Sequence, residues 1–106
     1  MRAKRSDRNH IIYQITGPDG VYIGVTAKTE STVLKSVRAR IAKHWYRAQT
    51  ETKQWALCAL LRSYESKEDI DVRVLEIVRG KQAAHARERE LIRAENPYYN
   101  TDKRGV

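Results

Sequence analysis

The chain has 106 residues, a length that suits a single domain. Lys and Arg number 21 against 13 Asp and Glu, which gives a net charge of +8, and 41% of the residues are hydrophobic. No apolar run approaches the ~20 residues of a membrane-spanning helix, and no apolar segment follows the basic N-terminus. We therefore expect neither an integral membrane protein nor a signal peptide.

The excess of positive charge favours a polyanionic partner, with nucleic acid first and an anionic membrane surface second. A membrane-surface protein concentrates its cations on one amphipathic helix, whereas Lys and Arg are spread through this whole chain. A charge that serves only solubility is the alternative. The single cysteine, Cys58, lies in the apolar run WALCALL, so we predict a buried structural thiol and a reducing compartment.

The N-terminal part of the chain predicts a basic arm followed by a β-hairpin. We expect residues 1–9 to form the flexible arm. Residues 10–16 (HIIYQIT) and 21–26 (VYIGVT) are rich in β-branched and aromatic residues, which are typical of strands. Between them, Gly17-Pro18-Asp19-Gly20 is a turn sequence, because proline presets φ and glycine accepts positive φ.

Two helices, a third strand and a third helix are predicted next. Ser31 or Thr32 can cap a helix that runs to about residue 49, and a second helix covers residues 52–66. Residues 70–78 (IDVRVLEIV) alternate and predict a strand, and residues 81–95 predict a helix that Pro97 ends. The buried face of the first helix is marked by Val33, Val37, Ile41 and Trp45.

The order β-β-α-α-β-α predicts an α+β domain, with a small central three-stranded sheet flanked by helices. We place this single domain at residues 10–102 and a short tail at residues 103–106.

Glu88 is an unusual residue of the predicted third helix. It is spaced by three or four residues from Ala84, Leu91 and Ile92, which places it on the apolar face, whereas Glu90 should face solvent. A carboxylate on a buried face needs a partner or a metal ion. An internal salt bridge to an arginine and a metal site are therefore both open.

Two further pairs of residues could take part in phosphate chemistry. Arg40 and His44 are one helical turn apart; they form either a solvated helix edge or a phosphate grip beside a proton donor or acceptor. With a turn centred on Pro18-Asp19, Tyr13 lies opposite Gly24, and Tyr13 and Tyr22 share one face of the sheet. These tyrosines are either core aromatics or two hydroxyls aimed at a phosphate.

Together these residues resemble the GIY-YIG nuclease family, over about residues 11–102. Ile11-Ile12-Tyr13 stands where the family has its first motif, and Tyr22-Ile23-Gly24 matches the second. Arg40 with His44 resembles the helix motif. Glu88 with Leu91-Ile92 resembles the metal-binding glutamate and the apolar pair after it. Pro97-Tyr98-Tyr99-Asn100 resembles the closing segment, at an interval from Glu88 like that of the excision-repair nucleases of the family.

The chain departs from the family at two places. Ile11 replaces the glycine of the first motif, which we expect to alter packing and not chemistry. Some members have a second histidine before the second helix, where this chain offers Lys53 or Trp55, so that role is unfilled or taken by Lys53.

The resemblance implies an endonuclease that hydrolyses phosphodiester bonds in DNA with one Mg²⁺ or Mn²⁺ ion held by Glu88. One carboxylate is sufficient for Mg²⁺ when phosphate oxygens and waters complete its shell. Arg40 would neutralise a phosphate oxygen, and the Asn100 amide would support the loops around the site.

The resemblance also implies a proton-transfer group. Tyr13 is the expected general base or water orienter, with a pKa lowered by nearby cations. Tyr22 would assist, and His44 would relay a proton or hold Tyr13 in place. Gly24 would leave space beside Tyr13.

The expected partner is DNA, with RNA as an open second substrate, in the cytoplasm of a prokaryotic or phage-infected cell. A homodimer or an accessory DNA-binding partner could supply selectivity. A catalytically silent basic nucleic-acid-binding module, or a subunit of a phage or repair complex, is the alternative. Expected contacts to nucleic acid come from cations of the arm and of the helical region, namely Arg2, Lys4, Arg5, Arg8, Lys43, Arg47 and Lys53.

Overall fold

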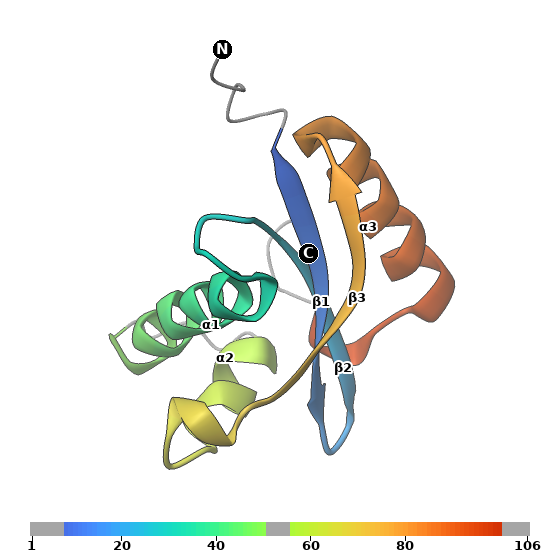
Figure 1. Cartoon of the computed structure of the whole chain (residues 1–106). Helices are drawn as coiled ribbons and strands as arrows, with labels where there is room; N and C mark the ends of the chain where they lie inside the picture. Colours follow the sequence, from blue (N-terminus) through green and yellow to red (C-terminus); the bar gives the residue numbers. More distant parts are fainter. Residues whose placement is uncertain (1–7, 51–55, 101–106) are drawn as a thin grey trace.

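The computed structural model describes residues 8–50 and 56–100. The two strands of the hairpin, β1 (Asn9–Gly17) and β2 (Gly20–Ala27), are followed by helices α1 (Val33–Thr50) and α2 (Ala56–Arg62). Strand β3 (Asp71–Arg79) and helix α3 (Lys81–Glu95) complete the predicted order (Figure 1). Two short 3-10 helices, η2 (Lys67–Asp69) and η3 (Tyr98–Asn100), precede β3 and follow α3. No helix in the described ranges is long and apolar enough to cross a membrane.

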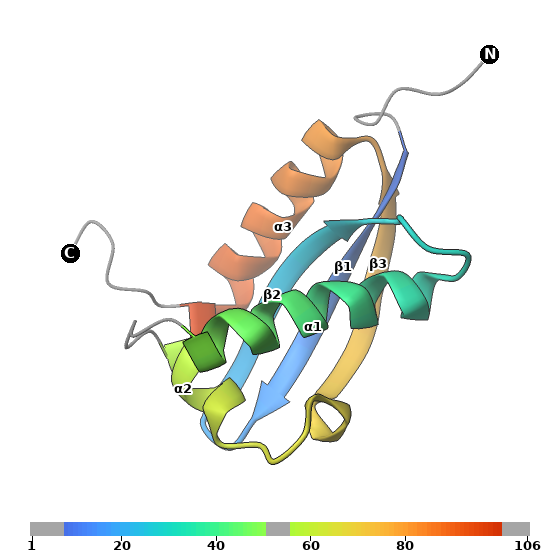
Figure 2. The ribbon, with the colours of Figure 1, turned by 90° about the vertical axis from the view of Figure 1, so that its left-hand side faces the viewer.

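The sheet has three antiparallel strands in the order β2-β1-β3, so β1 is central. Helices α1 and α2 lie on one side of this sheet and α3 on the other (Figures 1 and 2). The predicted α+β class is therefore confirmed, as a small sheet between two helical layers.

The hairpin has the register that its turn sequence predicts. Gly17 pairs with Gly20 around the turn, which places Tyr13 opposite Gly24 and Ile15 opposite Tyr22. Strand β1 begins at Asn9, which pairs with Arg79 of β3. The predicted end of the basic arm at residue 9 is therefore too far along the chain; residues 1–7 lie outside the described ranges.

The helices differ from the prediction mainly at the end of α2. Of the two candidate caps of α1, Thr32 fills the role, because the Lys35 amide donates to its Oγ1 at 3.1 Å. Helix α2 ends at Arg62 and not at residue 66, since the Ser63 and Tyr64 amides bond the carbonyls of Leu60 and Leu61 and tighten the last turn. The predicted start at residue 52 lies outside the described ranges.

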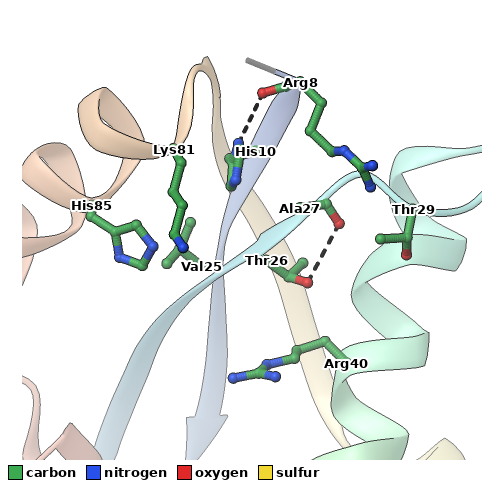
Figure 3. A pocket seen from close by; sticks show the side chains of 9 residues that line it. All are labelled: Arg8, His10, Val25, Thr26, Ala27, Thr29, Arg40, Lys81 and His85. Atoms are coloured by element: carbon green, nitrogen blue, oxygen red, sulfur yellow. Dashed lines mark hydrogen bonds between the residues drawn. The ribbon is translucent and has the colours of Figure 1, made fainter. Parts of the chain in front are cut away.

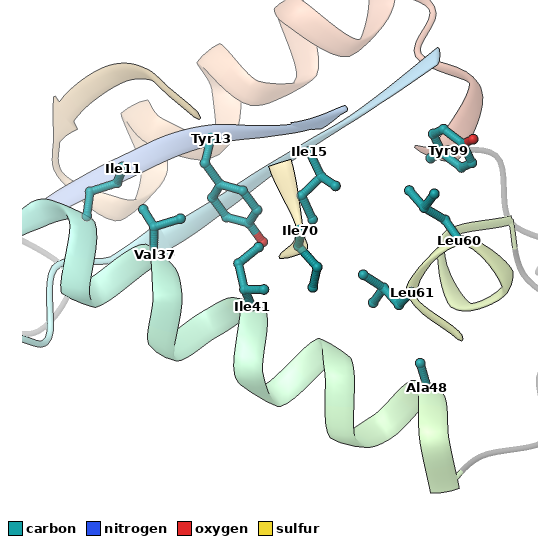
Figure 4. Close-up of a cluster of buried hydrophobic side chains, with 10 residues drawn as sticks. All are labelled: Ile11, Tyr13, Ile15, Val37, Ile41, Ala48, Leu60, Leu61, Ile70 and Tyr99. Carbon is teal, nitrogen blue, oxygen red and sulfur yellow. The ribbon is translucent and has the colours of Figure 1, made fainter. Parts of the chain in front are cut away.

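The main core fills the space between the sheet and the α1–α2 layer (Figure 4). It places the Tyr13 ring among aliphatic side chains of α1 and α2. Ile11 is fully buried in this core. The other buried members are Ile15, Val37, Ile41, Ala48, Leu60, Leu61, Ile70 and Tyr99.

Replacing Ile11 by alanine tests this packing role. We expect Ile11→Ala to lower the free energy of unfolding by ~2–5 kcal/mol, because it removes buried methyl groups and leaves a cavity. Ile77→Ala is the matched control, since Ile77 lies opposite Ile11 on β3 but is 50% exposed. Urea unfolding measures both variants, and equal losses of stability would contradict the assignment.

Candidate active site

Tyr13 and Tyr22 lie next to one another on the face of the sheet that meets α1. Their ring centroids are 6.3 Å apart. Gly24 makes this arrangement possible: a Cβ atom at this position would lie 2.6 Å from Tyr13 Oη and 2.8 Å from Tyr22 Cε1. The prediction that Gly24 leaves space beside Tyr13 is confirmed, and any larger residue would displace one of the two rings.

Helix α1 brings His44 and Arg40 to these tyrosines. His44 Nε2 lies 3.2 Å from Tyr13 Oη, within hydrogen-bonding distance. The His44 ring also meets the Tyr22 ring edge-on, at 5.9 Å between centroids. Arg40 lies one turn earlier, and its Nε atom is buried with no hydrogen-bond partner among the described residues. The Arg40–His44 pair is therefore not a solvated helix edge.

Glu88 approaches the site from α3. Its side chain is 19% exposed, and its Oε1 lies 3.6 Å from Nδ1 of His85. Glu90 is 63% exposed, as its helical position predicts. Within the described ranges, Glu88 lies within ion-pair distance of His85, which carries a charge only when protonated, and of no arginine. The salt bridge that the sequence left open is therefore absent from this part of the structure.

The electrostatics of the site correct one expectation, that cations lower the pKa of Tyr13. Burial raises the pKa of Tyr13 well above its ordinary value of 10.0, Tyr22 and Glu88 raise it further, and the opposing effect of Arg40 is smaller. Burial, followed by the charge of Glu88, also raises the pKa of Tyr22. Both phenols are neutral at pH 7, so Tyr13 cannot act there as a phenolate base.

His44 and Glu88 are also shifted toward their neutral forms. Burial and the charges of Arg40 and Arg47 lower the pKa of His44 from 6.5 to about 4. Burial raises the pKa of Glu88 above 4.5, and His85, Arg89 and Arg40 partly offset this effect. Arg40 thus influences the pKa of both tyrosines, of His44 and of Glu88.

Asn100 ties the end of the described chain to the edge of the sheet. Its Oδ1 accepts a hydrogen bond of 2.7 Å from the Ile23 amide, and its Nδ2 donates one of 2.8 Å to the Ile23 carbonyl. Ile23 lies between Tyr22 and Gly24, so this pair of bonds fixes Asn100 to β2 next to the tyrosines. Tyr99 has a contact that its place in the closing segment did not predict: its hydroxyl accepts a hydrogen bond from the Asp19 amide at 3.1 Å.

A cleft of about 550 Å³ opens beside these residues, between α1, the end of β2 and the start of α3 (Figure 3). His85 was not among the predicted site residues, although its position three residues before Glu88 places both on one helical face. Lys43 and Arg47 are exposed on α1, whereas Arg2, Lys4, Arg5 and Lys53 lie outside the described residues. The cleft is lined by Arg8, His10, Val25, Thr26, Ala27, Thr29, Arg40, Lys81 and His85.

Among the described residues, the site offers one carboxylate ligand for a metal ion, and not a complete set of protein ligands. The described ranges contain no group of three or more His, Cys, Asp or Glu side chains that could hold an ion alone. Mg²⁺ is nevertheless commonly held by one or two carboxylates together with phosphate oxygens and waters. Burial disfavours the charged form of Glu88, and a cation there would offset that cost. The donor chemistry of Glu88 is therefore compatible with one ion.

Comparison with protein-family models, with curated proteins and with solved structures finds no match to this chain.

The partly buried His44 makes the free energy of unfolding depend on pH. In the unfolded chain His44 titrates near 6.5 and in the fold near about 4, so only the unfolded state binds its proton between these values. The contribution of His44 to the free energy of unfolding is fully present above pH 6.5, and up to ~3 kcal/mol of it is lost as the pH drops to 4. Urea unfolding across this range should show a shallower decline for His44→Gln; parallel declines would contradict the shift.

Proposed function

We propose that this chain is a divalent-metal-dependent endonuclease that hydrolyses phosphodiester bonds in DNA at a single-metal site. The observation that carries the proposal is the convergence of Tyr13, Tyr22, His44 and Glu88 around Arg40. They come from both hairpin strands, α1 and α3, and the charge of Arg40 acts on all four. This is the set of residues through which the sequence resembles the GIY-YIG nucleases.

Arg40 is the residue best suited to bind the scissile phosphate. Its guanidinium is a planar fork of donors that matches phosphate oxygens. The buried Nε has no hydrogen-bond partner among the described residues, which is costly in an isolated protein. A phosphate oxygen beside Arg40 would satisfy the donor and neutralise the charge.

Activation of the attacking water is assigned to Tyr13 and His44 together. Tyr13 is a neutral phenol whose hydroxyl lies 3.2 Å from Nε2 of His44. It donates to that atom when the ring proton of His44 is on Nδ1. Tyr13 is fully buried in this structure, so the relay requires the bound strand to bring the attacking water to Tyr13 Oη. As the water attacks phosphorus, its proton passes to Tyr13 Oη, and the Tyr13 proton passes to His44 Nε2. The Arg40 charge that depresses the pKa of His44 is compensated when the anionic phosphate binds. His44 therefore becomes a better base in the substrate complex.

Glu88 is the residue that would hold Mg²⁺ or Mn²⁺. When bound, such an ion stabilises negative charge on the phosphate and on the departing 3′ oxygen. His85, at 3.6 Å from the Glu88 carboxylate, orients this side chain when no ion is present.

A catalytically silent nucleic-acid-binding module is the second candidate function. The complete burial of Tyr13 favours it, because a phenol with no exposed surface also suits a purely structural role. Such a module binds DNA in a salt-sensitive way and does not cut it, whichever divalent metal is added.

The metal assignment is tested with Glu88→Gln, which keeps the shape of the side chain and removes its charge. We expect the native protein to nick plasmid DNA with Mg²⁺ or Mn²⁺ and not with EDTA. The variant should be slower by ~10²–10⁴, because one catalytic group is lost. Glu90→Gln, on the exposed face of the same helix, should retain activity. Undiminished cutting by Glu88→Gln would refute the metal site.

The proton relay is tested by combining substitutions. Tyr13→Phe and His44→Gln should each slow cutting by ~10²–10⁴. Because the two residues act as one unit, the double variant should be no slower than the slower single variant. Tyr22→Phe leaves the relay intact. When it is combined with Tyr13→Phe or with His44→Gln, its own loss of rate should therefore multiply the loss caused by the other substitution. Single-turnover rates provide the measurement, and multiplying effects of Tyr13→Phe and His44→Gln would contradict the relay.

A further inference from the structure

The cleft of about 550 Å³ beside the site is built mainly from residues that the proposed chemistry does not use. Arg8 directly precedes β1, Thr26 is near the end of β2, and Lys81 and His85 are on the first two turns of α3 (Figure 3). Arg40 lies at the opposite end of the cleft from Arg8 (Figure 3). The cations therefore lie at separate places along the cleft, with Arg8 and Lys81 toward one end and Arg40 at the other.

The charged side chains that line this cleft are all basic. No Asp or Glu is among the described residues that line it. Elsewhere on α3 a cation is neutralised, since Arg87 pairs with Glu76 at 2.9 Å and with Glu90 at 3.1 Å. The first turn of α3 also contains no acidic residue, and its N-cap, Gly80, has no side chain. The positive end of the helix dipole therefore adds to the field of Lys81.

Arg8 is held in place from the main chain. Its carbonyl accepts hydrogen bonds from the Gly80 amide at 3.1 Å and from Nδ1 of His10 at 2.9 Å. These bonds link the starts of β1 and α3. The side chain of Arg8 thus extends into the cleft from a fixed backbone. Less conformational entropy is therefore lost when Arg8 binds a ligand.

The cleft is continuous with the candidate active site through two residues. Arg40 belongs to both. His85 lines the cleft and lies 3.6 Å from the Glu88 carboxylate. A strand with one phosphate at Arg40 and Glu88 can therefore continue past His85 toward Lys81 and Arg8.

We propose that this cleft is a subsite for a second, uncut phosphodiester of the DNA strand, bound by Lys81 and Arg8 on one side of the scissile phosphate. The inference rests on the proposed nuclease function. A nucleic-acid strand fits better than a single small anion, because its charges repeat along the backbone and the cations are spread along an open cleft. Binding there would set the polarity of the strand relative to the reacting groups, without reading the sequence.

The experiment uses an end-labelled DNA duplex in which one phosphate at a time is replaced by a neutral methylphosphonate. Partial digestion with Mg²⁺ gives a ladder of cuts. The native protein should fail to cut at the neutral phosphate itself. It should also cut ~10-fold more slowly at one further position, a fixed number of nucleotides to one side, where a charge-assisted contact is lost.

The variants separate the cleft from general electrostatics. Arg8→Gln with Lys81→Gln should abolish the second gap in the ladder and keep the first. Lys35→Gln with Arg73→Gln removes the same charge from exposed residues outside the cleft and should keep both gaps. Lys81→Gln alone should weaken the second gap, and because Lys81 is exposed, this variant tests the cleft even if the double variant fails to fold.

DNA binding in EDTA gives a readout that needs no cutting. The cleft double variant should lower the slope of log affinity against log salt by ~1–2 relative to the control double variant, because it loses one or two phosphate contacts. Equal slopes, or a second gap that survives in the cleft variant, would refute the subsite while leaving the nuclease proposal intact. A difference in slope seen only with RNA would refute the assignment to DNA.

Absence of cutting with any metal would refute the nuclease and, with it, this role of the cleft. Persistence of the slope difference in that case would indicate the binding module instead.

Discussion

The phenol of Tyr13 belongs to two environments, and much of the structure follows from that position. Its ring is part of the main core between β1 and α1, while its hydroxyl meets Nε2 of His44 at 3.2 Å. A buried hydroxyl needs a hydrogen-bond partner, so α1 has to place the His44 ring next to the Tyr13 hydroxyl. Gly24 must also lack a side chain, because the ring occupies the space beside it.

Burial then determines the charges of the site. The same packing that excludes water from Tyr13 keeps the phenol and His44 neutral and disfavours the ionised form of Glu88. The Arg40 guanidinium acts on the pKa of all three. The positive charge of Arg40 is therefore poorly balanced by its neighbours, and an added anion would balance it. This is the electrostatic basis of both the proposed chemistry and the proposed strand contact.

Local signals in the sequence predicted most of the fold. The Gly17–Gly20 turn sets the hairpin register, and Pro97 follows α3 as expected. Features that depend on packing were not predictable: the pKa of Tyr13 rises because α1 and α2 cover it, and the cleft joins Arg8 to residues more than 70 positions away. The early end of α2 depends on local hydrogen bonds at Ser63 that competed with helical periodicity.

The amide of Asn100 has a consequence beyond the site. Strand β2 is at the edge of the sheet, and exposed edges invite pairing with the strands of other molecules and hence aggregation. By bonding both the amide and the carbonyl of Ile23, Asn100 occupies the positions that an incoming strand would need. One side chain thus closes this stretch of the edge to sheet extension, and it does so without adding a strand to the fold.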